Sequence, residues 1–404
     1  MSGTKDGEIA FDDRPSAGVD AAWEFLDKHR DARGDDTSVK ALRRKIDWHI
    51  VPVMFCCYTM QFLDKVILNY AAVMNLPQDL HLRGNEFSNV ATFLFVALLC
   101  FEVPNAYFLQ VVPAAKWLGA NVVLWGIATA CGAAAHNYRT LLVSRIFLGI
   151  FEATIGPSLL LISSQWYTKS EQAPRFSLWY CGLGIGQIVG GAVSYGFQNV
   201  KREGFESWRI MFVVLGCVTV VIGLCTFFFL PDTPMQARWL TDEEKVVHLK
   251  HVSVNQTGIQ DREFRIGEIA EALLDPQVYL LMVAVILLSV NSGVVTTYSS
   301  TLIRNLGYSG PKAALMNMPS GVVSISFTLL VGYGIRKQSQ RWAWIIICII
   351  PAIIGGALMS FLPLTNRAGV LAGIYLVNAV TAPLAIFYNP PTSPAPRNAL
   401  SPQP

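Results

Sequence analysis

The sequence predicts an all-α, polytopic membrane helix bundle, and three observations support this fold class. Of the 404 residues, 52% are hydrophobic and only 15% are charged, whereas soluble domains carry roughly 25% charged residues. The mean hydropathy of the chain is +0.41. The apolar residues are gathered in ten blocks, each close to the ~20 residues that cross a bilayer as a helix. This composition excludes a water-soluble globular protein.

The ten predicted helices form a group of six followed by a group of four, separated by a polar loop. The predicted spans are residues 51–73, 87–109, 117–135, 141–163, 176–198, 209–230, 278–300, 315–334, 342–362 and 369–388. Six prolines in the last sixteen residues exclude a further helix there. The predicted domains are a charged arm at 1–49, a six-helix bundle at 50–230, a central loop at 231–277, a four-helix bundle at 278–388 and a disordered proline-rich tail at 389–404.

Lysine and arginine residues set the expected orientation, because loops on the cytosolic side retain them. With the arm placed in the cytosol, 21 of these residues lie on the cytosolic side and 8 on the opposite side, while Lys65 and Arg145 lie within helices. We therefore expect a multi-pass protein of the cell membrane, embedded in the lipid bilayer, with its N-terminus in the cytosol.

Five ionisable residues lie well inside the predicted spans, and all belong to the first six helices: Asp64, Lys65, Glu102, Arg145 and Glu152. Each charge would cost about 2.5–3.5 kcal/mol if it faced lipid, so each should face a partner or a wet cavity. Glu102, two residues before Pro104, is a candidate gating residue or a cap for backbone groups that the proline leaves free.

The fourth predicted helix places four residues on one face, at steps of four, three and four: Arg145, Gly149, Glu152 and Gly156. Small residues there allow close helix approach, and Asp64 of the first helix lies at a depth between the two charges. In one interpretation Arg145 attracts a carboxylate, and Asp64 or Glu152 takes up a proton. In the other, a permanent Asp64–Arg145 salt bridge only joins two helices. Both interpretations stay open.

Neutral polar residues in other spans are further candidates for substrate binding. Gln187 lies in the middle of the fifth helix, Asn291 and Tyr298 in the seventh, and Asn378 in the tenth. Such side chains line a cavity without needing a counter-ion, but they also bond neighbouring helices or their own backbone. The sequence does not decide between these uses.

No pattern predicts a metal, a cofactor, a nucleic-acid surface or an enzyme. The eight cysteines lie in apolar blocks without CxxC spacing, so they are expected to be free thiols. A net charge of +3 is too small for nucleic-acid binding. No GxSxG, HExxH or P-loop pattern occurs, so no catalytic residue is assigned.

Six segments of the chain carry a family resemblance: FLDKVILNYA (62–71), FLQVVPAAKWLGANVVLWG (108–126), RIFLGIFEATIGPSLLLISSQWYTKSEQ (145–172), GVVTTYSS (293–300), MNMPSGVVSI (316–325) and PAIIGGALMSFLP (351–363). They resemble the fungal allantoate permease family, a branch of the anion:cation symporters within the major facilitator superfamily. The resemblance covers roughly residues 45–388, and the fourth helix with the loop after it carries the most specific motifs.

The resemblance implies two pseudo-symmetric six-helix halves that work by alternating access, with the first, fourth, seventh and tenth helices lining the cavity. It also implies uptake of a small organic anion or a vitamin-like carboxylate, driven by protons. These helices would bring Asp64, Arg145, Glu152, Asn291, Tyr298 and Asn378 to the cavity.

Three departures from the family modify these expectations. The loop after the second helix lacks the usual basic residue behind Gln110, which leaves Lys116 as the candidate gating residue there. Gln187 stands where drug–proton antiporters of the superfamily usually have proline, and this favours uptake over export. The family pattern stops near Asn389, so we expect ten helices instead of twelve, an incomplete second bundle and impaired transport in the chain as written.

Two other functions stay open beside uptake. The first is export of a secondary metabolite or toxin encoded in a biosynthetic gene cluster, which neighbouring biosynthetic genes would favour. The second is a truncated, non-transporting sensor or an inactive remnant, which would bind its ligand without moving it across sealed vesicles.

Overall fold

The computed structural model describes residues 39–199, 206–252, 274–337, 341–363 and 365–383, together with Phe25 and Lys28. All regular structure in these ranges is helical, in agreement with the predicted class. The tail at 389–404 and most of the arm at 1–49 lie outside the described residues. Eight described segments are long and apolar enough to cross a bilayer: Val39–Val73, Glu86–Val111, Tyr138–Trp166, Pro174–Gln198, Ser207–Phe229, Pro276–Asn305, Gly310–Ile335 and Trp342–Phe361.

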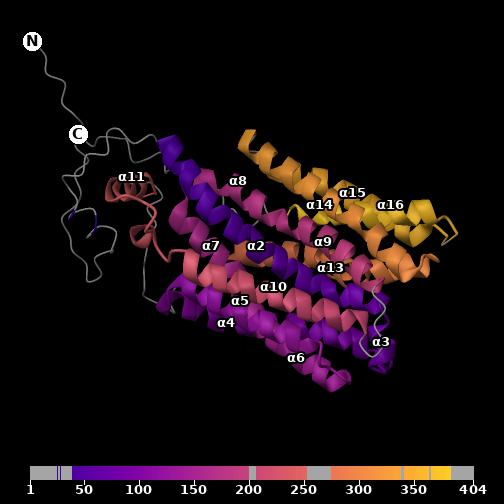
Figure 1. The fold of residues 1–404 in the computed structure, drawn as a ribbon. Helices are drawn as coiled ribbons and strands as arrows, with labels where there is room; N and C mark the ends of the chain where they lie inside the picture. Colours follow the sequence, from indigo (N-terminus) through magenta and orange to yellow (C-terminus); the bar gives the residue numbers. More distant parts are fainter. Residues whose placement is uncertain are drawn as a thin grey trace, which may run out of the picture.

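The first six predicted spans lie together as one group of helices. Its elements are α2 (Val39–Val73), α3 (Leu76–Asp79), α4 (Glu86–Val111), α5 (Ala114–Gly132), α6 (Tyr138–Glu152), α7 (Ile155–Trp166), α8 (Lys169–Tyr180), α9 (Gly182–Gln198) and α10 (Ser207–Phe229), called the first bundle. Two short helices follow it in the chain, η1 (Pro234–Gln236) and α11 (Asp242–Val252). Helix α10 packs along α5, α4 along α6, and α9 along α2. Figure 1 shows α2 crossing the middle of this bundle, with α11 near its N-terminal end.

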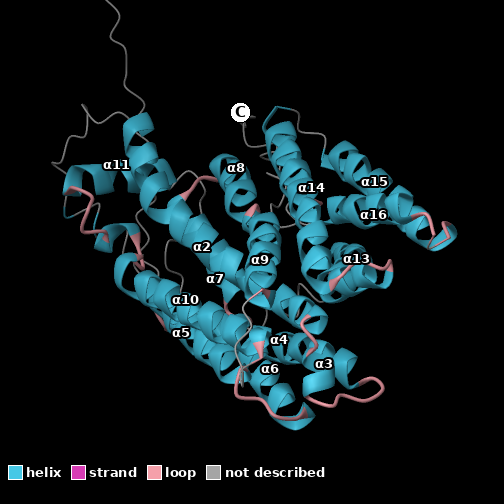
Figure 2. Cartoon of the chain, turned by 45° about the vertical axis from the view of Figure 1, so that its right-hand side comes forward, coloured by secondary structure: helices cyan, strands magenta, loops and turns pink. Residues whose placement is uncertain are grey.

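The last four predicted spans form a second helix group. Its elements are α13 (Pro276–Asn305), α14 (Gly310–Lys337), α15 (Arg341–Phe361), α16 (Arg367–Val377) and the short helix η3 (Asn378–Thr381). Helix α14 packs along α9, and α13 packs against α2, so the two groups meet directly. Figure 2 shows α14 beside α9, with α15 and α16 on the side away from α9.

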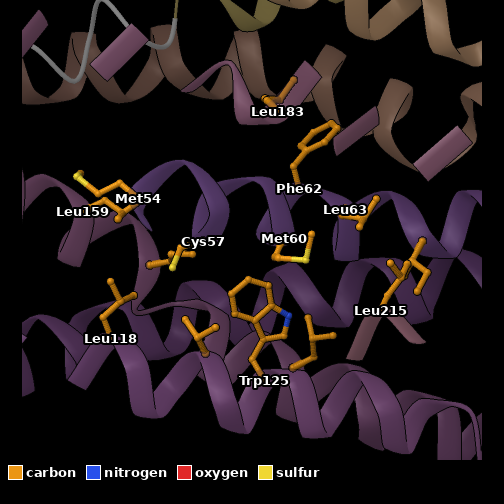
Figure 3. Packing of buried hydrophobic residues seen from close by; sticks show 14 of the residues in the cluster. Met54, Cys57, Met60, Phe62, Leu63, Leu118, Trp125, Leu159, Leu183 and Leu215 are labelled. Carbon is orange, nitrogen blue, oxygen red and sulfur yellow. The ribbon is translucent and has the colours of Figure 1, made fainter. Parts of the chain in front are cut away.

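The core of the first bundle is apolar and surrounds α2. Lipid is as apolar as these side chains, so close packing and a few hydrogen bonds hold such helices together, rather than exclusion of water. Trp125 of α5 is fully buried in this core. The side chains that meet there include Met54, Cys57, Met60 and Leu63 of α2, Leu118 of α5, Leu159 of α7 and Leu215 of α10 (Figure 3).

The fourth predicted span lies in Tyr138–Trp166, here called the fourth segment, which is interrupted at Ala153 and Thr154, between α6 and α7. Pro157 explains the break, since it has no N–H and its ring conflicts with the carbonyl four residues earlier, that of Ala153. The Thr154 hydroxyl at this break donates to Asn105 Oδ1 of α4 at 2.8 Å. Ala153 (φ −56°, ψ −21°) and Thr154 (φ −71°, ψ −26°) keep right-handed helical dihedrals, so the chain continues in the same direction from α6 into α7.

Gly149 marks a close approach of α6 to α4, whereas Gly156 does not. A Cβ on Gly149 would lie 2.5 Å from the backbone oxygen of Leu94, while a Cβ on Gly156 would meet nothing within 4 Å. The spacing of the two glycines had suggested close packing at both, but Gly156 borders open space instead.

We therefore expect Gly149→Ala to push α4 and α6 apart and to destabilise the protein by about 1–3 kcal/mol, as overpacking does. Thermal unfolding in detergent measures the effect as a lower Tm. The matched control is Gly156→Ala on the neighbouring helix, which should leave the Tm unchanged. Equal Tm values for the two variants would contradict the close contact at Gly149.

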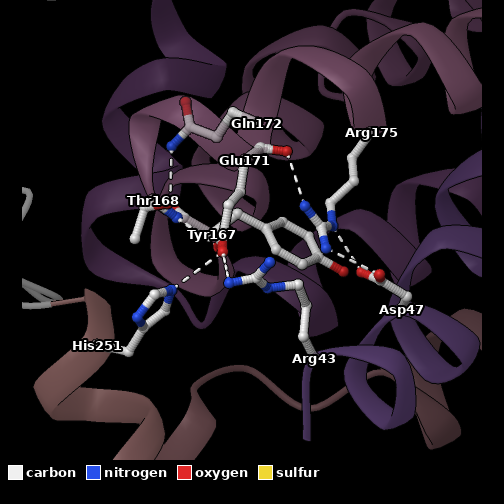
Figure 4. A network of polar contacts seen from close by, with 8 residues as sticks. All are labelled: Arg43, Asp47, Tyr167, Thr168, Glu171, Gln172, Arg175 and His251. Atoms are coloured by element: carbon white, nitrogen blue, oxygen red, sulfur yellow. Dashed lines mark hydrogen bonds and ion pairs between the residues drawn. The ribbon is translucent and has the colours of Figure 1, made fainter. Parts of the chain in front are cut away.

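A polar network covers the end of the bundle where α2 begins (Figure 4). Arg175 of α8 donates two hydrogen bonds, of 2.6 and 2.8 Å, to the carboxylate of Asp47 on α2. Glu171 pairs with Arg43 of α2 and, at 3.0 Å, with His251 of α11. Burial raises the pKa of Glu171, but His251 and Arg43 together lower it further, so its pKa lies below the ordinary value. The network attaches α11 to the bundle.

His248 of α11 is buried with its ring centre 5.5 Å from that of Trp166. Burial and the nearby His251 lower the pKa of His248 to about 4, although Glu171 acts in the opposite direction. A solvated histidine has a pKa near ~6.5. When α11 is docked on the bundle, His248 binds fewer protons than it does when α11 is detached. Docking of α11 should therefore be strongest above pH ~6.5 and weaken as the pH falls toward the pKa that His248 has in the docked form.

Hydrogen exchange of the α11 amides at pH 7.5 and 5, corrected for intrinsic rates, measures this dependence. We expect lower protection at pH 5. His248→Phe keeps an aromatic ring against Trp166 and should remove most of the pH effect, while His251 remains in place. Unchanged protection of the native protein at pH 5 would contradict the prediction.

Candidate functional site

Asp64 and Lys65 are adjacent on α2 but reach different neighbours. Asp64 Oδ2 accepts a hydrogen bond of 2.5 Å from Trp125 Nε1 of α5. Lys65 Nζ lies 3.1 Å from Glu152 Oε1, at the last residue of α6. Consecutive helical residues point about 100° apart, which explains why the two side chains diverge. Arg145 interacts electrostatically with both Asp64 and Glu152, so the four charges form one buried network.

Arg145 is buried and contacts α2 at Asp64. Its Nη1 donates to the backbone oxygen of Asp64 at 3.3 Å, and its guanidinium carbon lies 5.0 Å from the centre of the Phe212 ring. The two side chains form no ion pair, and within the described residues no hydrogen-bond partner reaches Nε or Nη2 of Arg145 or Oδ1 of Asp64. The permanent Asp64–Arg145 salt bridge considered from the sequence is not present.

Lys65 and Glu152 line a cavity of 160 Å³ in the first bundle. The Glu152 side chain is 0% exposed and that of Lys65 is 21% exposed, so the ammonium is the more accessible partner. The whole lining comprises Tyr58, Gln61 and Lys65 of α2, Leu98 and Glu102 of α4, Glu152 of α6, Ala153, Gly156, Pro157 and Leu160 at the break and in α7, and Phe176, Trp179 and Tyr180 of α8. The cavity therefore borders the broken part of the fourth segment.

This cavity combines one ammonium with two carboxylates, those of Glu152 and Glu102. A buried ion pair is stable only while both partners are present, because one buried charge left alone is strongly unfavourable. Any anion that binds Lys65 therefore raises the tendency of Glu152 to take up a proton. The arrangement is chemically suited to coupling anion binding to protonation.

Asn105 and Trp125 make polar contacts that the sequence pattern did not indicate. Asn105 Oδ1 accepts from Trp117 Nε1 at 3.3 Å in addition to its bond with Thr154, so it joins α4, α5 and the break. A polar residue directly after Pro104 was the available signal for Asn105. An indole N–H inside an apolar span gives no such signal.

Gln187 belongs to a polar layer that joins the two helix groups, rather than to the cavity. Its Nε2 donates to Asn317 Oδ1 of α14 at 3.4 Å. Asn317 Nδ2 in turn donates to the hydroxyl groups of Tyr70 on α2 and Ser300 on α13, both at 3.3 Å. Asn69 of α2 donates to the hydroxyl of Ser299 at 2.9 Å. We refer to these residues as the polar layer: Asn69, Tyr70, Gln187, Ser299, Ser300 and Asn317.

Tyr298 and Asn378, the other neutral candidates whose side chains are described, do not line this cavity. The Tyr298 hydroxyl bonds Ser88 of α4 at 2.6 Å, so it joins α13 to the first bundle. Asn378 is buried and its Nδ2 donates to the backbone oxygen of Ile374 at 2.8 Å, the local use that the sequence left open. Asn291 lies within α13, but its side chain is outside the described residues.

The two candidate gating residues differ in position. Glu102 lines the cavity beside Lys65. The Lys116 ammonium donates to the backbone oxygen of Phe227 at the end of α10, and the Lys116 backbone N–H donates to Asp232 Oδ1 at 3.1 Å. The described contacts of Lys116 thus fasten α5 to α10 within one bundle.

Comparison with known proteins identifies the family. Residues 54–398 match the Major Facilitator Superfamily. The chain is 35% identical over 393 residues to the thiamine pathway transporter THI73 of Saccharomyces cerevisiae, covering 96% of this chain and 72% of that protein. It is 29% identical over 371 residues to the allantoate permease of the same yeast, covering 89% and 68%.

Solved structures share the fold. The proton:xylose symporter XylE bound to 6-bromo-6-deoxy-D-glucose has a TM-score of 0.61 at 16% identity, covering 85% of this chain and 81% of that one. A bacterial homologue of the human lysosomal transporter Spinster has a TM-score of 0.60 at 18% identity, covering 83% and 73%. With its apolar helices and its family match, this chain belongs to the major facilitator superfamily and is a multi-pass membrane transporter, not an enzyme.

Proposed function

We propose that this transporter takes up a small organic anion together with a proton by alternating access. The observation that carries the proposal is the Lys65–Glu152 ion pair of 3.1 Å at a cavity inside the first bundle. In the proposal Lys65 binds the carboxylate of the substrate and Glu152 carries the proton. The allantoate permease of yeast, a relative at 29% identity, is named for an organic anion.

Charge balance is the physical argument for this coupling. In the empty cavity Lys65 and Glu152 neutralise each other. When an anion pairs with Lys65, Glu152 would be left as a buried, unpaired carboxylate, which is unfavourable by several kcal/mol. Uptake of one proton by Glu152 restores neutrality. Empty and loaded forms then carry the same net charge, so both can reorient within the membrane.

Arg145 and Asp64 have a supporting part in the proposal. Arg145 holds the backbone of α2 at Asp64, one residue before Lys65, through a bond of 3.3 Å. A charge network held in this way fixes the direction in which Lys65 leaves the helix. Glu102, at the cavity beside Lys65, acts as the gating group on the α4 side. Gln187 and its polar layer are the contacts that separate when the two helix groups move apart.

We further propose that the protein lies in the cell membrane with the start of α2 facing the cytosol. The excess of lysine and arginine on that side supports this orientation, with 21 of the 31 residues there. The network of Arg43, Glu171 and His251 then lies at the cytosolic end.

Reconstitution into proteoliposomes tests the proposal. A pH gradient, acidic outside, should drive accumulation of a carboxylate from a panel that includes allantoate and succinate. A pH dye inside the vesicles should report proton entry with the anion, and a protonophore should abolish accumulation. Liposomes without protein are the control. Uptake that is indifferent to the protonophore, or anion entry without proton entry, would refute the coupling.

A further inference from the structure

The last turn of α2 is held by the second helix group through its backbone. Arg304, in the last turn of α13, donates from Nη1 to the backbone oxygen of Ala72 at 3.3 Å. A Cβ on Gly310, the first residue of α14, would lie 2.7 Å from the backbone oxygen of Val73, so α14 begins directly against the end of α2. The last four carbonyls of a helix have no partner within it, and a cation there also interacts favourably with the helix dipole. Arg304 therefore supplies a donor that the end of α2 needs.

One turn deeper, Asn69 of α2 bonds α13 as both donor and acceptor. Its Nδ2 donates to the Ser299 hydroxyl at 2.9 Å, and its Oδ1 accepts from the Ser300 backbone N–H at 3.0 Å. Asn69 and Ser299 are both fully buried. A buried amide is unfavourable unless its polar atoms find partners. The two helices can therefore separate at this end only if water enters the polar layer.

Arg304 differs from the polar layer because it is charged and only partly buried. The polar layer consists of neutral side chains, and a hydrogen bond from a charged donor is roughly twice as strong as a neutral one. Within the described residues no carboxylate pairs with Arg304, so its described acceptor is the α2 carbonyl. Loss of this guanidinium should weaken the contact between α2 and α13 without removing any group from the polar layer.

We propose that Arg304 is a positioning residue of the transport cycle, which holds the last turn of α2 and keeps the pathway closed on the side where α2 ends. This inference rests on the proposed function for alternating access, and adds the contact that sets the balance between the closed and open forms of that side. Lys65 lies seven residues before Ala72 on the same helix, about two turns away. Release of the last turn therefore also frees the part of α2 that carries the cation of the cavity.

Labelling of a cysteine reporter with a hydrophilic maleimide tests this inference on the purified full chain in detergent. Ser299→Cys places the reporter in the polar layer, and Thr219→Cys places it on α10 inside the first bundle, where Thr219 is also fully buried. The labelling of the protein without a reporter is subtracted, because the chain has eight cysteines of its own. Added to each reporter, Arg304→Met should speed the labelling of Ser299→Cys at least tenfold, as expected for loss of a hydrogen bond from a charged group. The labelling of Thr219→Cys should stay unchanged.

Arg83→Met is the matched control, because Arg83 is exposed and lies between α3 and α4, near the same end of α2. It should change neither labelling rate. An unchanged rate for Ser299→Cys in the Arg304→Met background would overturn the inference. An equal rise for both reporters would also overturn it, because general loosening of the fold exposes both positions.

This assay needs neither a substrate nor a proton gradient, so it fails separately from the proposed function. A normal response to Arg304→Met in a protein without proton coupling would reject only the proposed function. Proton-coupled uptake by a protein that lacks this response would reject the role of Arg304 alone.

Discussion

Replacing Lys65 with Met should reduce anion uptake about 100-fold, because a hydrogen bond between charged groups contributes roughly 1.5–3 kcal/mol. Lys65 is the cation that lines the cavity, and its Nζ lies 3.1 Å from Glu152. Methionine has a similar length and no charge, so the cavity keeps its shape but loses its anion-binding group. Initial uptake rates in proteoliposomes, normalised to inserted protein, measure the loss.

Stability must be separated from binding in this experiment. Lys65→Met leaves Glu152 without its partner, and breaking a buried pair destabilises a protein by about 3–5 kcal/mol. The double variant Lys65→Met, Glu152→Gln replaces the ion pair with two neutral groups, so its Tm should recover while uptake stays low. Recovery of uptake together with the Tm would show that Lys65 serves only the fold.

Arg145 provides a second comparison, since the sequence offered it as the anion-binding group. Arg145 lies outside the cavity lining, 2% exposed and bonded to the backbone of α2. Arg145→Lys keeps the charge and should lower the Tm more than the affinity for the anion. If Arg145→Lys has the native Tm and no measurable affinity for the anion, Arg145 and not Lys65 is the anion-binding group.

The fold was predictable because the bilayer constrains it strongly. A spanning helix needs ~20 apolar residues, so hydropathy alone located the spans. Glycines at four-residue spacing let two helices approach closely, and α2 packs against three such glycines of α9: Gly182, Gly186 and Gly190. Periodicity along one helix also placed Arg145 and Glu152 correctly on the buried side of the fourth segment.

The partners of these residues were not predictable, because periodicity gives a face and a depth on one helix and does not tell which neighbour fills the space opposite. Depth alone brought Asp64 between Arg145 and Glu152. Depth could not show that Trp125 donates a hydrogen bond to the Asp64 carboxylate, or that the adjacent Lys65 pairs with Glu152.

Contacts between spans far apart in the sequence could not be predicted either, because the sequence does not show which helices are neighbours. Gln187 and Asn317 are 130 residues apart and meet only because α9 packs along α14. The break at Ala153 and Thr154 depends on Pro157, whose presence in a membrane helix is compatible with a bend, a break or neither. The cavity arises where this break leaves room beside the aromatic side chains of α8.

Replacing Glu152 with Gln should uncouple the transporter from protons without abolishing movement of the anion. Glutamine has nearly the same shape as glutamic acid and resembles its protonated, neutral form. The variant therefore mimics the loaded state, in which Lys65 is free to bind the anion. Exchange of internal for external anion needs only this state and should continue. Accumulation driven by a pH gradient needs a change in protonation at residue 152 and should disappear.

Two assays on the same vesicles distinguish these steps. Counterflow, with unlabelled anion inside and labelled anion outside, should stay within about threefold of the native rate, and uptake driven by the pH gradient should fall to the level of liposomes without protein. Glu243→Gln on α11 is the matched control, because Glu243 is exposed and lies outside the cavity lining. It should keep gradient-driven uptake. If Glu152→Gln still accumulates anion against a gradient and Glu102→Gln does not, the proton is carried on α4 and the ion pair serves only to hold α2 against α6.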